Sequence, residues 1–197
     1  MPFSVFYSLT LTAALTTWSP GPNNILLLSN ASKYGLKKNL KFMCGIWTGS
    51  FSLMLLCGVC TKALTSIVPG IRSAMTCIGA AYLLYLSYAT LKRLPPGEER
   101  DTKEPTYKMG VFLQLINVKI IIYGLTMFSS FILPYEGRPL ILLLFAFYLM
   151  FMGALGNILW AFAGNVLKQS YERHYRGMNA CMALLLVWCA LRVLGIL

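Results

Sequence analysis

The chain alternates between long apolar stretches and short stretches rich in Lys and Arg. Six stretches carry almost no charge: Phe3–Ser29, Phe42–Thr61, Ser73–Leu91, Met109–Leu133, Leu140–Leu167 and Met178–Leu197. Each is long enough, as a helix, to cross a hydrocarbon core of about 30 Å. The strands of a membrane barrel would alternate apolar and polar residues in runs of about ten, and these stretches do not. The pattern predicts an all-α membrane protein with six transmembrane helices.

Composition strengthens this prediction. Of the 197 residues, 57% are hydrophobic and only 12% are charged, and the mean hydropathy is +0.66. An ordinary soluble domain has about 25% charged residues. A soluble chain of this size could not bury so much apolar surface, which argues against a soluble enzyme.

The net charge of +11 indicates the membrane topology of the chain rather than binding to nucleic acid. A nucleic-acid binder gathers its basic residues on one folded face, whereas here they separate apolar stretches. Twelve follow the first, third and fifth stretches: Lys33, Lys37, Lys38, Lys41, Lys92, Arg93, Arg100, Lys103, Lys108, Lys168, Arg173 and Arg176. Only Lys62, Arg72 and Arg138 follow the second and fourth, and Arg192 lies near the end of the last stretch, where its side chain can snorkel. The positive-inside rule places the basic loops in the cytoplasm of a plasma or inner membrane, with both termini outside.

The whole chain, 1–197, is expected to form a single transmembrane domain. The linker of residues 92–108 contains Pro95, Pro96 and Pro105 and separates a first repeat of about 1–91 from a second of about 109–197. Three spans in each half give the halves opposite orientations, as in many secondary transporters. No Lys or Arg precedes the first stretch, so we expect no cleaved signal peptide.

The first apolar stretch contains a helix-breaking motif, Pro20-Gly21-Pro22, followed by Asn23 and Asn24. Two prolines and a glycine make a continuous helix improbable. Freed backbone groups in lipid must be satisfied by protein, water or substrate, so a break here should line a cavity. A helix restarting after Pro22 offers N–H groups to a carboxylate, while the preceding carbonyls suit an ammonium group. The alternative is a packing kink repaired by neighbouring helices.

Lys119 lies about ten residues into the fourth stretch, near the middle of the bilayer. A cation there costs about 2.5–3.5 kcal/mol or more, and no Asp or Glu lies in any stretch to pair with it. Its partner is then a backbone carbonyl, water or a substrate carboxylate. Tyr123 shares its helix face, and Asn117 lies just before it. The alternative is a lysine that caps the broken first span and never meets substrate.

The fifth stretch has one helix face built from Gly153, Asn157, Trp160 and Gly164. Small residues on such a face permit close helix packing, and Gly45-x-x-x-Gly49 is a similar face in the second stretch. Helix packing is therefore the main interpretation of both, and a homodimer is compatible with them. Asn157 is also a candidate cavity group.

Nothing in the sequence indicates catalysis. His174 stands alone in a basic loop, and there is no carboxylate cluster or nucleophile motif. We therefore expect no enzyme activity, no catalytic residue, no metal and no cofactor. Cys57-x-x-Cys60 leaves open a membrane thiol redox carrier, although cysteine in an apolar helix usually acts as a small hydrophobe. A binding or scaffold subunit is a further alternative.

The motifs together resemble the lysine exporter (LysE/RhtB) family of amino-acid efflux proteins. The family's proline-glycine-proline-asparagine signature stands as Pro20–Asn23, and its glycine-alanine-alanine-tyrosine-leucine run as Gly79–Leu83. Its asparagine-proline-lysine stands as Asn117-Val118-Lys119, so valine replaces the proline. This departure leaves open whether the fourth span is broken like the first.

The resemblance implies a secondary transporter that exports amino acids by alternating access. The run Gln114–Gly124 is most similar to members that export cysteine and O-acetylserine, which implies small neutral amino acids as substrates. Homoserine, threonine and lysine remain alternatives. The substrate-binding candidates are Pro20, Gly21, Pro22, Asn23, Asn24, Asn117, Lys119, Tyr123 and Asn157.

Overall fold

The structure is a computed structural model that describes residues 1–92 and 104–194, without the side chains of 62–76, 78–79, 172 and 192–193. Its elements are α1 (Phe3–Trp18), α2 (Pro22–Tyr34), α3 (Leu36–Leu91), α4 (Tyr107–Leu115), α5 (Val118–Thr126), the π-helical η1 (Met127–Ile132), α6 (Pro139–Val166) and α7 (Lys168–Leu194). The linker residues 93–103 and the last three residues of the sixth apolar stretch lie outside this description.

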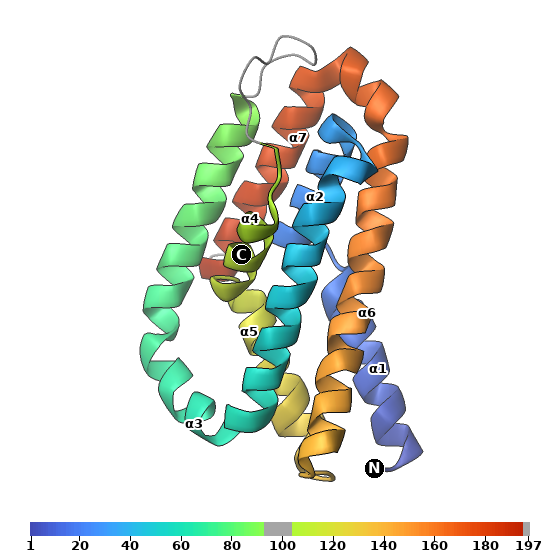
Figure 1. The fold of residues 1–197 in the computed structure, drawn as a ribbon. Coiled ribbons are helices and arrows are strands. Elements are labelled where there is room, and N and C mark those ends of the chain that lie inside the picture. Colours follow the sequence, from blue (N-terminus) through green and yellow to red (C-terminus); the bar gives the residue numbers. More distant parts are fainter. Residues whose placement is uncertain (93–103, 195–197) are drawn as a thin grey trace.

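The helices form an elongated bundle (Figure 1). Helix α3 turns back on itself, so that its two arms correspond to the second and third apolar stretches; the backbone leaves helical geometry at Cys60. The α2–α3 junction, the end of α3 and the α6–α7 junction lie at one end of the bundle, and the N-terminus lies at the other (Figure 1). The basic stretches that these junctions carry therefore share one end of the molecule, called below the basic end.

Among the described residues, two single helices are long and apolar enough to span a membrane, Leu36–Thr61 and Pro139–Val166. A third candidate span is the pair Tyr107–Leu115 and Val118–Ile132, which is bent by 61° at the break between them. These spans match the second, fifth and fourth predicted stretches, and the described residues are consistent with an α-helical membrane protein.

The break between α1 and α2 follows from local backbone chemistry. Proline disfavours helical geometry in the residue before it, and Ser19 is extended, with φ −62° and ψ 153°. Gly21 is also extended and forms the N-cap of α2, and Pro22 occupies its first turn, where no N–H is needed. The predicted interruption of the first apolar stretch is present.

The fourth span is broken as well, although it contains no proline at the break. Helix α4 ends at Leu115, and Asn117 leaves helical geometry with φ −82° and ψ 92° before α5 begins at Val118. Asparagine side chains compete with the helical backbone for hydrogen bonds, and Asn117 uses its amide to donate to Asn23. The replacement of proline by valine therefore preserves the break, which answers the question that the sequence left open.

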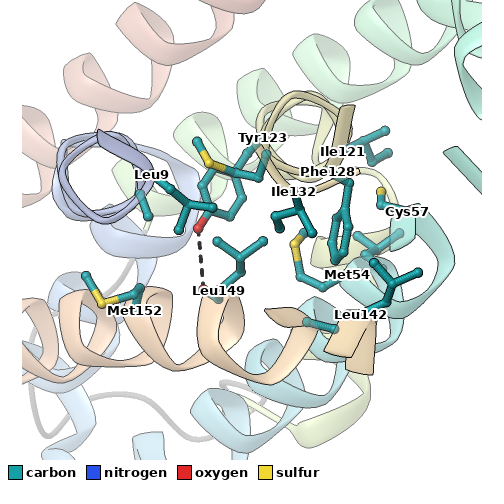
Figure 2. Close-up of a cluster of buried hydrophobic side chains, with 14 residues drawn as sticks. Leu9, Met54, Cys57, Ile121, Tyr123, Phe128, Ile132, Leu142, Leu149 and Met152 are labelled. Atoms are coloured by element: carbon teal, nitrogen blue, oxygen red, sulfur yellow. Dashed lines mark hydrogen bonds between the residues drawn. The ribbon is translucent and has the colours of Figure 1, made fainter. Parts of the chain in front are cut away.

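Apolar clusters pack above and below the level of the two breaks. Towards the N-terminal end, α1, α3, α5, η1 and α6 share a cluster that includes Leu9, Phe128 and Leu149 (Figure 2). Towards the basic end, residues of α2, α3, α4 and α6 form a second cluster, and α2, α3 and α7 form a third. The buried amides at the breaks therefore lie in a polar layer between apolar clusters.

Small residues let α3 and α4 cross closely. A Cβ added to Gly45 would collide with the carbonyl oxygen of Tyr107, and one added to Gly110 would collide with the backbone of Phe42. Gly49 approaches Gln114 in the same way, since a Cβ added to Gly49 would lie 2.8 Å from Cβ of Gln114. The small face at Gly45 and Gly49 is therefore a helix-packing face within the chain.

Two ion pairs lie outside the apolar spans. Lys38 pairs with Glu104 at 2.5 Å, which joins the start of α3 to the segment before α4. In the turn before α6, hydrogen bonds from Arg138 lower the pKa of the exposed Glu136 carboxyl to about 2. Arg138 is thus paired with a carboxylate at the end of the bundle opposite the basic end, which sharpens the charge difference between the two ends.

Candidate functional site

The two broken spans meet through three amide side chains. Asn23 donates from Nδ2 to Oε1 of Gln114 at 2.6 Å, and Asn117 donates to Oδ1 of Asn23 at 3.1 Å. Gln114 in turn donates to the hydroxyl of Ser50 on α3. Asn23, Gln114 and Asn117 are at most 7% exposed. This set of four side chains, called below the amide cluster, connects α2, α3, α4 and α5 at the break.

A second group of donors satisfies the carbonyls freed at the end of α1. Asn24 donates to the carbonyl oxygens of Thr17 and Ser19 at 2.8 and 3.0 Å. The indole of Trp160 donates to the carbonyl of Trp18 at 2.9 Å. Three consecutive carbonyls are thereby paired, which removes the cost of leaving them bare in an apolar environment.

Helix α6 positions these donors. Asn157 donates to Oδ1 of Asn24 at 2.8 Å, so it orients the amide that caps α1. The indole of Trp18 donates back to the carbonyl of Met152 at 3.0 Å. The close approach depends on Gly156, because a Cβ there would lie 2.6 Å from Cδ1 of Trp18. Gly156 precedes Asn157 and lies one turn after Gly153, so this side of α6 packs against the break itself.

Lys119 lies against the break in the first span. Its Nζ donates to Oγ of Ser19 at 2.9 Å, and a Cβ added to Gly21 would lie 3.0 Å from the same atom. No other hydrogen bond to this ammonium group is found in the described parts of the chain, which leaves two of its three N–H groups for another partner. The contact with Ser19 is the one that the capping alternative expects.

The positive ends of two helices converge beside this ammonium group. Helix α2 begins at Pro22 and α5 begins at Val118, and residues from both first turns line a single small cavity with Lys119. Helix N-termini carry partial positive charge, so they favour an anion. No Asp or Glu lines this cavity, and the site therefore has an excess of positive charge.

Two cavities adjoin Lys119, Gly21 and Pro22. The small one, of about 30 Å³, lies among the amide cluster and Asn157 and has room for about one or two waters. The large one, of about 630 Å³, is an open groove between α1, α5 and α7 and is called below the hydroxyl groove. Lys119 thus lies between a small polar pocket and a larger groove.

The structure brings most of the predicted site residues together. Pro20, Gly21, Pro22, Asn23, Asn24, Asn117, Lys119 and Asn157 all line one or both of these cavities. Tyr123 lies apart from the amide cluster: it packs in the apolar core with 4% exposure, and its hydroxyl is directed at the carbonyl of Leu149 (Figure 2). It reaches the site only as part of the wall of the hydroxyl groove.

Sequence reasoning did not select Ser19, Ser50, Gln114 or Trp160 as site residues. Gln114 lies one turn before Asn117, and Trp160 lies one turn after Asn157, so both share a face with a selected amide. That spacing is a usable signal. Ser50 has no such neighbour in sequence, and only the packing of α3 against α4 brings it to Gln114.

The remaining candidates for chemistry stay apart. In the described part of the chain, no three His, Cys, Asp or Glu side chains come close enough to hold a metal ion. The six cysteines form no disulfide, and Cys57 is buried in the core near Gly124.

Comparison with known proteins gives consistent matches over nearly the whole chain. The family model described as LysE type translocator matches residues 14–195. A cysteine/O-acetylserine efflux protein of Klebsiella pneumoniae is 37% identical over 190 residues, which cover 96% of this chain and 95% of that protein. Proteins of the same description from Salmonella paratyphi A and Escherichia coli O1:K1 are 36% and 34% identical, with at least 96% of each chain covered. No solved structure gives a significant match.

Proposed function

Because the chain belongs to the LysE type translocator family, we propose that it exports small neutral amino acids, most specifically cysteine and O-acetylserine, from the cytoplasm. The chain is thus an integral membrane transporter rather than an enzyme. Relatives that are 34–37% identical over 95% or more of their length are described as cysteine/O-acetylserine efflux proteins, which supports this substrate class. Homoserine, threonine and lysine are the competing cargoes within the family's range.

One observation carries the proposal: an ammonium group and two helix N-termini face one cavity without an acidic partner. An amino acid supplies the missing anion as its carboxylate. Charge-assisted hydrogen bonds to Lys119 and to N–H groups in the first turns of α2 and α5 would hold that carboxylate. Lys119 then acts both at the break, through Ser19, and on the substrate.

The substrate ammonium needs acceptors in the same region. The carbonyls of Thr17, Trp18 and Ser19 each accept from protein donors, so they offer an ammonium group only a second lone pair. Asn117 lines the small cavity, and its Oδ1 accepts no hydrogen bond from the described residues. We assign the ammonium group to Asn117 Oδ1 together with the second lone pairs at the end of α1.

Alternating access would follow from the arrangement of the two halves. The first and fourth spans are both broken, and interrupted helices in corresponding positions of two repeats are typical of a transporter's binding site. We propose that the chain has six spans arranged as two inverted repeats that move against each other around the amide cluster. The hydrogen bonds between Asn23, Gln114 and Asn117 would then break and re-form in each cycle.

The test is transport by the purified protein in liposomes loaded with labelled cysteine or O-acetylserine. We expect efflux of both, with homoserine, threonine and lysine as competitors that rank the specificity. Lys119→Met should lower efflux by about 10-fold to 100-fold, because a hydrogen bond to a charged group contributes about 1.5–3 kcal/mol. Lys108→Met, at the exposed start of α4, is the matched control and should transport normally.

Three results would contradict parts of the proposal. Normal efflux by Lys119→Met, inserted and folded like the wild type, removes Lys119 from the binding site. Loss of efflux when Cys57 and Cys60 are both replaced by alanine favours the thiol redox carrier instead. Absence of any efflux from wild-type liposomes favours a binding or scaffold subunit.

A further inference from the structure

The hydroxyl groove has a regular polar lining that the binding site itself does not require. Thr12 and Thr16 lie one turn apart on α1, Ser19 follows the last residue of that helix, and all three line the groove. Residues with this spacing share one helix face. Across the groove, Lys119 and Thr126 lie seven residues apart on α5 and also line it.

Three of these hydroxyls make no hydrogen bond within the described part of the chain. Ser and Thr in apolar helices usually donate to the carbonyl four residues earlier, as Thr10 and Thr17 do to Phe6 and Ala13. Thr12, Thr16 and Thr126 make no hydrogen bond with any described residue. A hydroxyl left unpaired in hydrocarbon costs free energy, so these groups face water or a polar ligand.

The groove leads from Lys119 away from the basic end. Thr12 lies two turns nearer than Ser19 to the N-terminus, and the N-terminus lies at the opposite end of the bundle from the basic stretches (Figure 1). In the other direction, the cavity among the residues of the amide cluster has a volume of only about 30 Å³. The cavity space next to Lys119 is therefore small among the amide cluster and large along the groove.

The charge and size of the groove fit a hydrated zwitterion. Lys119 is its only charged lining residue in the described chain, and its volume of about 630 Å³ lies within the range of small-molecule sites. A second cation, such as a lysine side chain, would find no carboxylate there. A small neutral amino acid with its water would find hydroxyls along both walls.

We propose that the hydroxyl groove is the water-filled outer half of the translocation path, in which a zwitterionic amino acid released from Lys119 passes along Thr12, Thr16 and Thr126. The identity of the cargo rests on the proposed function; the path itself rests on the groove. Helix α7 closes one side of this path through Trp188 and Cys189.

The test uses a full-length variant whose six cysteines are replaced by alanine and whose efflux is first shown to be intact. Thr16→Cys in this background places a thiol in the groove, and Leu15→Cys places one on the exposed apolar face of α1. A charged, membrane-impermeant methanethiosulfonate reagent is added outside intact cells. We expect Thr16→Cys to react at least about 10-fold faster than Leu15→Cys, because a thiol in hydrocarbon does not ionise.

O-acetylserine should slow the labelling of Thr16→Cys, and it suits this assay because it has no thiol to consume the reagent. Labelling that O-acetylserine does not slow supports the path but contradicts the proposed cargo. Failure of Thr16→Cys to react, or reaction only from the cytoplasmic side in inverted vesicles, overturns the proposed path.

A second pair of variants tests the hydroxyl itself. Thr16→Val keeps the shape of the side chain and removes its hydroxyl, and we expect it to lower the efflux rate several-fold. Thr48→Val is the control, since Thr48 lies outside the groove and its hydroxyl donates within α3. Equal efflux by the two variants would exclude a role for the Thr16 hydroxyl.

Discussion

At the scale of single residues, the site depends on polar side chains that each have a structural partner. Asn24 and Trp160 satisfy the carbonyls at the end of α1, and Asn157 orients Asn24. A broken helix in a membrane survives only when such partners replace the lost helical hydrogen bonds. Lys119 differs, because one contact with Ser19 leaves most of its hydrogen-bonding capacity unused.

Trp160 provides a prediction at this scale. Trp160→Phe removes the donor to the Trp18 carbonyl and should lower stability by about 0.5–1.5 kcal/mol, the net contribution of a typical intramolecular hydrogen bond. Trp47→Phe is the matched control, because the buried indole N–H of Trp47 has no hydrogen-bond partner among the described residues. Thermal unfolding in detergent measures both variants. If Trp47→Phe is the more destabilising, packing rather than the hydrogen bond dominates at these positions.

At the scale of elements, close helix crossings hold the breaks at one level. Helix α4 crosses α3 at Gly45 and Gly110, and α6 crosses the end of α1 at Gly156. Each crossing brings a polar residue to the site: Ser50 follows Gly45 by five residues on α3, and Asn157 follows Gly156 on α6. The small residues at these crossings therefore determine which polar side chains can come into contact.

The crossing of α3 and α4 can be tested by adding one methyl group. Gly110→Ala should separate the helices and destabilise the protein by about 1–3 kcal/mol, the usual cost of overpacking. Gly177→Ala adds the same group to α7, where nothing lies within 4 Å, and should be neutral or slightly stabilising. Equal melting temperatures for the two variants would show that α3 and α4 can separate without cost.

At the scale of the whole molecule, the basic stretches and the hydroxyl groove lie on opposite sides of Lys119. The basic stretches share one end, and the hydroxyl groove extends from Lys119 towards the other end, whereas the cavity among the amide cluster is small. With the basic end in the cytoplasm, as we propose, the groove lies in the outer half of the protein.

The orientation of the chain is the prediction that belongs to this scale. The positive-inside rule predicts that both termini lie outside and that the linker of residues 92–108 lies in the cytoplasm. An alkaline phosphatase fused to the C-terminus should therefore be active in a Gram-negative host. A fluorescent protein inserted into the linker should fluoresce. The reverse pair of results would invert the topology and place the hydroxyl groove on the cytoplasmic side.

The sequence by itself determined the class of fold, the break at Pro20-Gly21-Pro22 and the unusual position of Lys119. These follow from rules that act within a few residues: apolar length, the missing N–H of proline and the cost of a cation in lipid. The family motifs indicated the function, because they are short runs of neighbouring residues that can be recognised in the sequence alone.

The tertiary structure alone decided the second break, the partners of the freed carbonyls and the presence of the hydroxyl groove. Asn117 leaves the helix without a proline, and its amide meets Asn23, 94 residues away. Trp160 reaches the carbonyl of Trp18 across 142 residues. Such contacts depend on how helices cross, and no local pattern encodes the crossing, because each helix packs against whichever faces its neighbours leave free.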